Sequence, residues 1–414
     1  MNGVEEYIAK GWDMCIRENK EDKGDLIGLP YPYSVPGFCW EDAQKDVHNH
    51  SVEVFNEMYY WDTYFTNVGL ILSGRADMAR NNADNMLYLI EKFGFMPNGN
   101  RTYFLDRSQP PFLSLMVRDV YEHFKDKDWL AKAYATLCKE YDFWMTNRIS
   151  SMGLNHYGHG EFVLPAEEYA SWYTDRLGYI PDYTVEHMAS HFMATAESGW
   201  DITPRFRSDA FNFAPVDLNS ILYMFETNMS FFSDELGNGS SQIWSDRATH
   251  RKSLMLKYLD RGDGLLVDYN FAEQNHSETV SSASIYPLFA GLSDKKNAEA
   301  LINNLPRLET EYGILSCEKT DIKGSFQWGY PNGWACLHYI AIMGLDKYGF
   351  KTEAMRIATK YTQLVETVFE KTGNLWEKYN VCEGNINVTN EYEMPAMMGW
   401  TAGVYLGAKK YIDG

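Results

Sequence analysis

The stretch DLNSILYMFETNMSFFSD, residues 217–234, decides the fold class. Its apolar residues recur at steps of three and four, at Leu218, Ile221, Leu222, Phe225, Met229 and Phe232. This spacing places them on one face of an α-helix, and Asp217 is the expected N-cap. The stretch therefore predicts an amphipathic helix that buries one face against a core.

The same periodicity recurs along the chain. A second stripe consists of Leu130, Ala133, Leu137, Tyr141 and Trp144. Similar patterns cover residues 3–18, 60–73, 76–93, 110–124, 185–197, 240–260, 293–305, 331–345, 351–370 and 398–411. No stretch shows several alternating strands joined by hairpin turns. About a dozen helices without a strict repeat indicate an all-α protein.

Long segments rich in Gly, Pro, Asn and aromatic residues separate the predicted helices. They cover residues 26–50, 94–112, 150–182, 198–216, 262–284, 311–334 and 373–397. Loops of this length inside a compact domain are usually functional. Because no low-complexity linker divides the chain, we expect one domain over residues 1–414 whose loops build a single site.

Composition and charge narrow the partners and the location. The 414 residues carry 37 Lys and Arg against 57 Asp and Glu, a net charge of −20, which disfavours nucleic acid and anionic lipid partners. The longest apolar runs fall far short of the roughly 18–20 residues of a membrane span. Glu5 and Glu6 stand where a secretory signal has basic residues, so a cytoplasmic location is expected.

Cysteine and histidine spacing gives no sign of a metal centre. The six cysteines have no CxxC spacing, so reduced thiols are expected rather than a disulfide framework or a zinc knuckle. His187 and His191 are four residues apart without the glutamate of a zinc-protease motif. No Walker loop, GxGxxG before a helix or GxSxG is present. We predict no metal and no cofactor.

Two aromatic and polar segments are suited to sugar binding. In YYWDTYF, residues 59–65, Asp62 lies among aromatic residues, where a carboxylate must be paired or serve a ligand. The alternative is an aromatic core segment. In MPNGNRTYFLDRSQPP, residues 96–111, Asn98, Arg107 and Gln109 are candidates for binding hydroxyls before a helix that starts at the prolines. The alternative is a loop held by its own hydrogen bonds.

Two further segments carry candidate acids and bases. In ESGWDITPR, residues 197–205, Asp201 follows a helix, and the desolvating Trp200 favours the protonated form that a general acid needs. The alternatives are an N-cap or an ion pair with Arg205. In WEKYN, residues 376–380, Glu377 stands beside Lys378, which makes a salt bridge the alternative. The residues alone do not single out Glu377 among its neighbouring glutamates.

Together, these segments resemble the trehalases of glycoside hydrolase family 37. The matching stretches, in the family's order, are Tyr59–Thr66, Pro97–Pro111, Glu197–Arg205, Gln327–Trp334 and Glu377–Tyr379. The segment 29–37 near the start also resembles a family segment. The resemblance implies an (α/α)6 toroid and metal-free hydrolysis of α,α-trehalose, a small disaccharide, with inversion at the anomeric carbon.

The resemblance also implies roles for individual residues. Asp201 would be the general acid and Glu377 the general base. Glu391 would bind the second sugar. The remaining substrate-binding residues would be Phe55, Trp61, Asp62, Asn98, Arg107, Gln109, Glu167, Gly199, Pro331, Asn332 and Trp334.

The chain departs from the family where the leaving group binds. Val54 and Pro165 stand where trehalases have arginines, although both catalytic acids are kept. Replacements could come from another loop, at Arg176, Arg205 or Arg207. Two alternatives therefore stay open: the same chemistry on another small α-glucoside or a glucosyl- or mannosyl-glycerate-like compound, and a non-catalytic sugar-binding protein.

Overall fold

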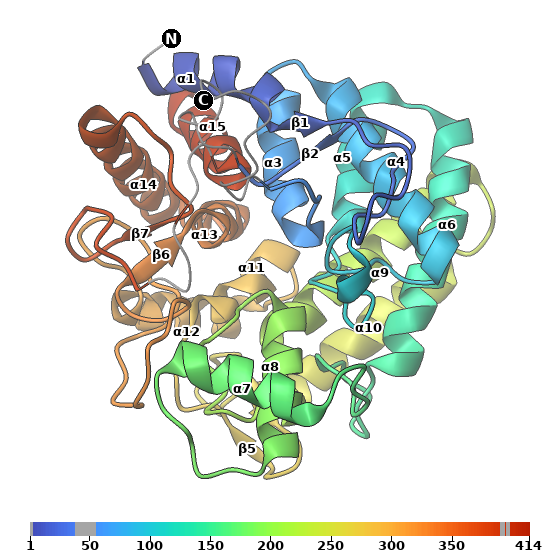
Figure 1. The fold of residues 1–414 in the computed structure, drawn as a ribbon. Helices are drawn as coiled ribbons and strands as arrows, with labels where there is room; N and C mark the ends of the chain where they lie inside the picture. Colours follow the sequence, from blue (N-terminus) through green and yellow to red (C-terminus); the bar gives the residue numbers. More distant parts are fainter. Residues whose placement is uncertain (1–2, 38–54, 390–393, 395–397) are drawn as a thin grey trace.

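The computed structural model describes residues 3–37, 55–389, 394 and 398–414, which fold almost entirely into α-helices (Figure 1). The helices are α1 (Gly3–Gly11), α3 (Tyr60–Leu72), α4 (Ala76–Phe93), α5 (Leu113–Phe124), α6 (Lys127–Asn147), α7 (Ala166–Leu177), α8 (Val185–Ser198), α9 (Val216–Leu236), α10 (Ser241–Tyr258), α11 (Tyr286–Ala290), α12 (Lys295–Asn304), α13 (Ala335–Lys347), α14 (Lys351–Thr372) and α15 (Gly399–Asp413). The all-α prediction is confirmed.

The described strands are short and form three small antiparallel sheets. They are β1 (Ile16–Arg17), β2 (Tyr33–Ser34), β3 (Phe213–Ala214), β4 (Tyr269–Asn270), β5 (Asn275–His276), β6 (Asn332–Trp334) and β7 (Lys378–Asn380). The sheets are β1–β2, β3–β4–β5 and β6–β7. In the last sheet Trp334 pairs with Lys378, which joins two segments that the sequence predicts to carry site residues.

Six helices form a closed ring. In ring order they are α3, α5, α9, α11, α13 and α15, and each packs against the next, with α15 returning to α3. Outside the ring, α4 packs on α3 and α5, α10 packs on α9, and α14 packs on α13 and α15. Figure 1 shows this circular arrangement, with the two termini close together. It is the (α/α)6 toroid that the resemblance implies.

The apolar stripes read from the sequence become the core. All five residues of the stripe from Leu130 to Trp144 are buried in α6. Helix α9 begins one residue before Asp217, so this carboxylate lies in the first turn instead of capping the helix. The N-cap prediction is wrong because Asp217 pairs with a buried arginine, Arg205.

Three local predictions are wrong. Helix α7 lies within the predicted loop 150–182, where Gly and Pro hid the spacing of Tyr169, Tyr173 and Leu177 that packs on α8. Helix α5 begins at Leu113, after the two prolines rather than at them. Residues 332–334 form β6 before α13 instead of its first turn. At each of these places, glycines and prolines interrupt the apolar spacing, so the spacing did not predict the correct element or its first residue.

Two further features concern the cysteines and membrane spans. The five cysteines in the described part of the chain are free, as predicted. None of the helices within the described ranges is both long and apolar enough to cross a membrane. The expectation of one domain over residues 1–414 stays a prediction.

Helices α3 and α15 approach most closely at two glycines. A Cβ atom on Gly403 would overlap the carbonyl oxygen of Phe65, and one on Gly69 would lie 2.5 Å from the Cα atom of Gly403. Real Cβ atoms do not approach backbone this closely, so the contact requires glycine. This contact holds α3 against α15, the two helices whose first turns carry Trp61 and Trp400.

We predict that Gly403→Ala lowers the thermal unfolding midpoint by several degrees relative to Gly407→Ala. Both changes gain about 1 kcal/mol of helix propensity, but only Gly403 meets backbone, and overpacking costs about 1–3 kcal/mol. Gly407 on the same helix is the control, because its Cβ would first meet the Tyr339 ring at 3.2 Å. Equal midpoints for the two variants would contradict the close helix contact.

Candidate active site

Five buried indole rings form the tryptophan cluster: Trp61, Trp200, Trp328, Trp334 and Trp400. The Trp328 ring is central. Its centroid lies 3.8 Å from that of Trp334, 5.1 Å from Trp200, 5.6 Å from Trp61 and 6.4 Å from Trp400. The cluster thus brings together segments that are far apart in the sequence.

Three carboxylates are attached to this cluster. Asp62 and Asp201 each directly follow a cluster tryptophan in the sequence. The carbonyl oxygen of Glu377 accepts a hydrogen bond of 3.2 Å from the Trp400 indole. Asp62 lies in the first turn of α3, and Asp201 follows the C-terminus of α8. The predicted acid and base therefore border one aromatic cluster.

The electrostatics show that the three carboxylates are close enough to interact. Burial raises the pKa of Asp62 to about 7, and the charge of Glu377 adds to the effect. Burial also raises the pKa of Asp201 to about 6, although Arg176 and Arg107 oppose the rise. Both aspartates keep partial contact with solvent. Asp201 can therefore hold a proton in mildly acidic solution, as a general acid must.

Glu377 has a different environment. Its side chain is almost fully buried, and its Oε2 atom lies 2.6 Å from Lys378 Nζ. The same Nζ lies 3.4 Å from Gln327 Oε1. The salt bridge that the sequence offered as an alternative is thus present, and it belongs to the site. Asp201 thus lies where burial favours its protonated form, whereas Glu377 is paired with the ammonium of Lys378.

The predicted hydroxyl-binding residues also hold the loop that carries them. The backbone N–H of Trp61 donates to Gln109 Oε1 at 3.2 Å. The Asn98 amide donates to the carbonyl oxygens of Ser108 and Ala196 at 3.2 and 3.3 Å. The bond from Asn98 to Ser108 lies within the loop and fits the alternative of a loop held by its own hydrogen bonds. The other two bonds join the loop to Trp61 of α3 and to Ala196 of α8. They fix the segment 96–111 against α3 and α8.

Arg107 retains a polar group that can serve a ligand. Its guanidinium forms an ion pair of 2.6 Å with Asp106 and lies 5.1 Å from the Phe104 ring centroid. Its Nε is buried and has no hydrogen-bond partner among the described residues. A buried donor without a partner costs about 1–3 kcal/mol. Because Arg107 also acts on Asp201, this N–H is a candidate for binding a sugar hydroxyl.

The predicted residues near β6 make structural contacts. The Asn332 amide donates to the carbonyl oxygens of Gln327 at 3.0 Å and of Thr389 at 2.9 Å. The carbonyl oxygen of Pro331 accepts from the N–H of Val381 at 3.1 Å. These bonds hold the loops around the Glu377 segment, so Asn332 shapes the site through the backbone.

The other predicted residues lie in varied surroundings. Gly199 ends α8 with a φ of +72°, and a Cβ there would lie 2.7 Å from Trp61, so glycine is needed for packing. Phe55 is half-buried, with its ring centroid 6.1 Å from that of Tyr59. Glu167 is exposed in the first turn of α7. Glu391 and Val54 lie outside the described residues.

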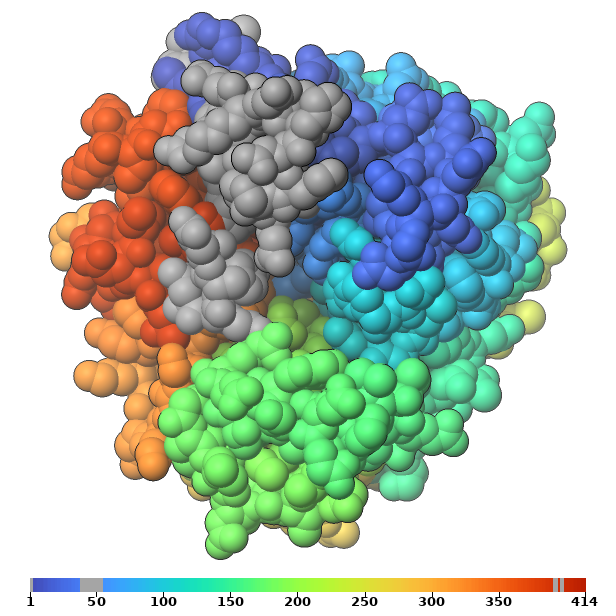
Figure 2. All heavy atoms as spheres, viewed as in Figure 1, coloured from blue at the N-terminus to red at the C-terminus, as the bar shows by residue number. Residues whose placement is uncertain are grey.

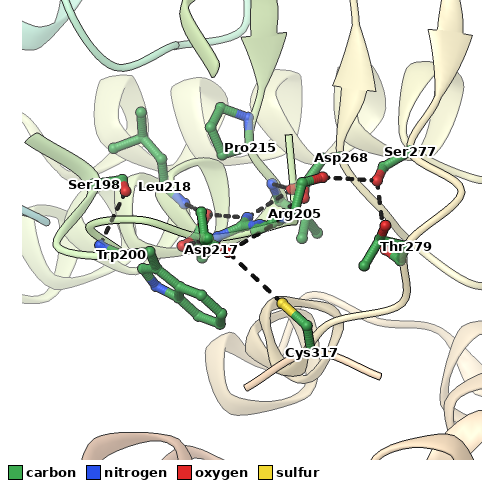
Figure 3. A network of polar contacts seen from close by, with 12 residues as sticks. Ser198, Trp200, Arg205, Pro215, Asp217, Leu218, Asp268, Ser277, Thr279 and Cys317 are labelled. Atoms are coloured by element: carbon green, nitrogen blue, oxygen red, sulfur yellow. Dashed lines mark hydrogen bonds and ion pairs between the residues drawn. The ribbon is translucent and has the colours of Figure 1, made fainter. Parts of the chain in front are cut away.

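A buried charged network supports the segment that carries Asp201 (Figure 3). Arg205, wholly buried, forms ion pairs with Asp217 at 2.7 Å and with Asp268 at 2.6 Å. Its guanidinium carbon lies 4.8 Å from the Trp200 ring centroid. Arg205 is therefore committed to structure, and the predicted alternative of an Asp201–Arg205 pair is wrong.

Of the other two candidate arginines, Arg176 is the one that acts on Asp201. Arg207 is exposed and paired with Glu278. Arg176 lies on α7, with its guanidinium carbon 5.3 Å from the Phe192 ring centroid. Figure 2 shows that the segment containing α7 and α8, coloured green, forms a lobe of the face seen in Figure 1.

The sequence analysis missed the role of Glu197. This buried carboxylate pairs with Arg148 at 2.7 Å and accepts from the N–H groups of Ser108 at 2.8 Å and Gly158 at 2.6 Å. It thereby ties two long loops to the end of α8. Its place at the start of the ESGWD segment was the available signal, but the contacts are between distant residues.

The site can now be compared with known proteins. The Trehalase family profile matches residues 48–412. The periplasmic trehalases of Xanthomonas oryzae pv. oryzae and Xanthomonas axonopodis pv. citri are each 32% identical to this chain, over 97% of it and 72% of their own length. This chain belongs to the trehalase family. Membership makes it a glycoside hydrolase, so the alternative of a non-catalytic sugar-binding protein is set aside.

Solved structures agree with the family's fold. The neutral trehalase from Saccharomyces cerevisiae is 27% identical, with a TM-score of 0.78, over 94% of this chain and 77% of that one. A GH63 mannosylglycerate hydrolase from Thermus thermophilus is 17% identical, with a TM-score of 0.65, over 97% of this chain and 99% of that one. The second likeness concerns the fold alone.

The predicted cytoplasmic location is wrong. The trehalase relatives from Xanthomonas are named periplasmic, and they match this chain over almost its entire length. The prediction relied on the residues around Glu5 and Glu6, and the names of these relatives overturn it.

We predict that Asp62→Asn raises the thermal midpoint at pH 8 and has little effect at pH 4. The pKa of Asp62 rises from 3.8 to about 7 on folding, so the folded state binds this proton more tightly than the unfolded chain. The stability contributed by the proton is complete below about pH 4 and is lost as the pH rises through about 7. The asparagine removes that loss, and differential scanning calorimetry across this range measures it.

Glu197→Gln is the control of opposite sign. Burial alone would raise the pKa of Glu197, but Arg148 and the two backbone N–H groups outweigh it and hold the pKa below its usual value. This variant should therefore lower the midpoint at pH 8. A lower midpoint for Asp62→Asn than for the native protein at pH 8 would contradict the prediction, because it would mean that the fold stabilises the ionised Asp62 carboxylate.

Proposed function

We propose that this chain hydrolyses α,α-trehalose to glucose by an inverting mechanism, with Asp201 as general acid and Glu377 as general base. The observation that carries the proposal is the pair of environments around one tryptophan cluster. Burial raises the pKa of Asp201 to about 6, which favours its protonated form in mildly acidic solution, while Glu377 is paired with Lys378. Two carboxyl groups in opposite protonation states are what inverting hydrolysis requires.

In the proposed reaction, Asp201 gives its proton to the oxygen that bridges the two sugars. Glu377 takes a proton from a water molecule as that water attacks the anomeric carbon from the opposite face. The C–O bond to the leaving glucose breaks while the bond to water forms. An inverting enzyme separates its carboxyl groups by about 6.5–9.5 Å to admit this water. The products are one β-glucose and one α-glucose.

The surrounding residues would bind the reacting sugar. The aromatic faces of Trp61 and Phe55 suit the apolar C–H face of a glucose ring, and Asp62 suits its hydroxyl edge. The buried Nε of Arg107 supplies a further donor. Enclosure by aromatic side chains strengthens these hydrogen bonds because it lowers the local dielectric constant.

Fewer residues of this chain can be assigned to binding the leaving sugar than to binding the reacting sugar. Pro165 is the N-cap of α7, at a position where the family has an arginine, so its guanidinium is missing there. We propose that Arg176 supplies a positive charge on this side. Because the arginine is missing at Pro165, another small α-glucoside is the second candidate substrate. The names of the relatives support a periplasmic location for this chain.

We predict that the native protein releases equal amounts of β- and α-glucose from trehalose in the first minutes, as ¹H NMR of the anomeric protons will measure. Asp201→Asn and Glu377→Gln should each lower kcat by about 10²–10⁴-fold with near-native thermal midpoints. Asp13→Asn, which removes an exposed carboxylate, is the control for the loss of an acidic group and should leave kcat unchanged.

Two results would count against the proposal. Release of α-glucose alone would mean retention of configuration. Turnover of another α-glucoside without turnover of trehalose would keep the chemistry and replace the substrate.

A further inference from the structure

Lys378 is fully buried beside the proposed base, although lysine is almost never fully buried unless it is paired. Its Nζ lies 2.6 Å from Glu377 Oε2, 3.4 Å from Gln327 Oε1 and 4.6 Å from the ring centroid of Trp334. A carboxylate, an amide oxygen and an aromatic face thus compensate the buried charge. All three lie within the site.

The backbone fixes this arrangement. The β6–β7 register pairs Trp334 with Lys378, so the indole and the ammonium that lies over it are held by one antiparallel ladder. The Trp334 indole donates to the carbonyl oxygen of Gln327 at 3.2 Å, which holds the amide-bearing residue nearby. The ladder therefore fixes the backbone of Lys378 beside that of Trp334, from where the ammonium contacts both the indole face and Glu377.

Several titratable groups feel the charge of Glu377. Asp62 on α3 and Asp201 after α8 are carboxyl groups whose pKa values are raised in part by the charge of Glu377, and the pKa of the Cys336 thiol on α13 is raised by burial and by the charges of Asp62 and Glu377. Like charges in a desolvated space repel one another, so negative charge gathers around this carboxylate. Lys378 brings a cation into direct contact with Glu377.

We propose that Lys378 is a positioning residue for the general base: it holds Glu377 Oε2, and so keeps this carboxylate ionised and oriented toward the attacking water. The inference rests on the proposed function because it takes Glu377 as the base. A salt bridge that only stabilised the fold would affect stability, but it would not affect the step in which the base acts. Catalysis should depend on the charge at position 378 through the base step.

The first test compares Lys378→Met, which removes the charge at similar length, with Lys378→Arg, which keeps it. Lys378→Met should lower kcat on trehalose about 10²-fold, since misplacing a catalytic group costs about this much, with KM changed less than about three-fold. The acidic limb of kcat/KM should move to higher pH. Lys378→Arg should recover part of kcat and restore the limb.

Lys347→Met is the matched control. Its ammonium is also desolvated, which lowers the pKa of Lys347, and it donates to the carbonyl oxygen of Phe289 at 2.6 Å. It lies at the last residue of α13, at the end opposite to β6. This variant should keep the native kcat and pH profile. It thereby distinguishes the effect of removing any desolvated lysine from the effect of removing Lys378.

The second test uses α-glucosyl fluoride, whose fluoride leaves without being protonated. Water then attacks the anomeric carbon as the C–F bond breaks, and the base still takes the proton. Lys378→Met should lose as much turnover on the fluoride as on trehalose, whereas Asp201→Asn should lose much less on the fluoride. A loss for Lys378→Met on trehalose alone would place Lys378 in the acid step and overturn the inference.

The remaining outcomes are also decisive. A native kcat and pH profile in a Lys378→Met protein of normal thermal midpoint would overturn the inference. If Lys378→Met does not fold, Lys378→Gln, which also removes the charge, takes its place with the same expected losses, and a native kcat and pH profile there would overturn the inference. Inactivity of the native protein on trehalose would instead overturn the proposed function.

Discussion

The packing of Trp328 against four other indole rings is the contact on which the site depends. These four rings come from different segments: the start of α3, the turn after α8, β6 and the start of α15. Aromatic pairs contribute about 0.5–1.5 kcal/mol each beyond their buried area. Because Asp62 and Asp201 each follow a ring of the cluster in sequence and Glu377 accepts a hydrogen bond from another, the packing of the rings also sets the relative positions of the proposed catalytic groups.

The same cluster divides the buried charges into two classes. Behind Trp200, Arg205 satisfies Asp217 and Asp268 with short ion pairs, and this network serves the fold. On the site side, Asp62 and Asp201 have raised pKa values and keep some contact with solvent. Carboxyl groups whose pKa values are shifted by burial and by neighbouring charges are typical of functional sites. Catalysis here is therefore expected to cost stability.

Sequence periodicity predicted those parts of the fold whose order is local. Helix α4 has the bounds predicted, residues 76–93, because its apolar stripe is regular and Gly94 ends it in the left-handed conformation that glycine favours. Helix α7 was missed because its stripe lies within a segment with many loop-forming residues. Closure of the ring depends on contacts such as Gly69 with Gly403, which no local pattern contains.

The site was predictable to the extent that its residues stand beside one another in sequence. Asp201 follows Trp200, so a desolvated acid could be inferred there, whereas the central place of Trp328 and the contact of Lys378 with Gln327 depend on the fold. The leaving-group side was least predictable, since Arg176 lies on the missed helix. Trp61 and Asp62, proposed to bind the reacting sugar, lie in the first turn of α3, whereas Pro165, on the proposed leaving-group side, stands at the N-cap of the missed helix α7. The proposed acid and base therefore depend on tryptophan packing that holds distant segments together, and the proposed role of Arg176 depends on a helix that the local sequence pattern did not reveal.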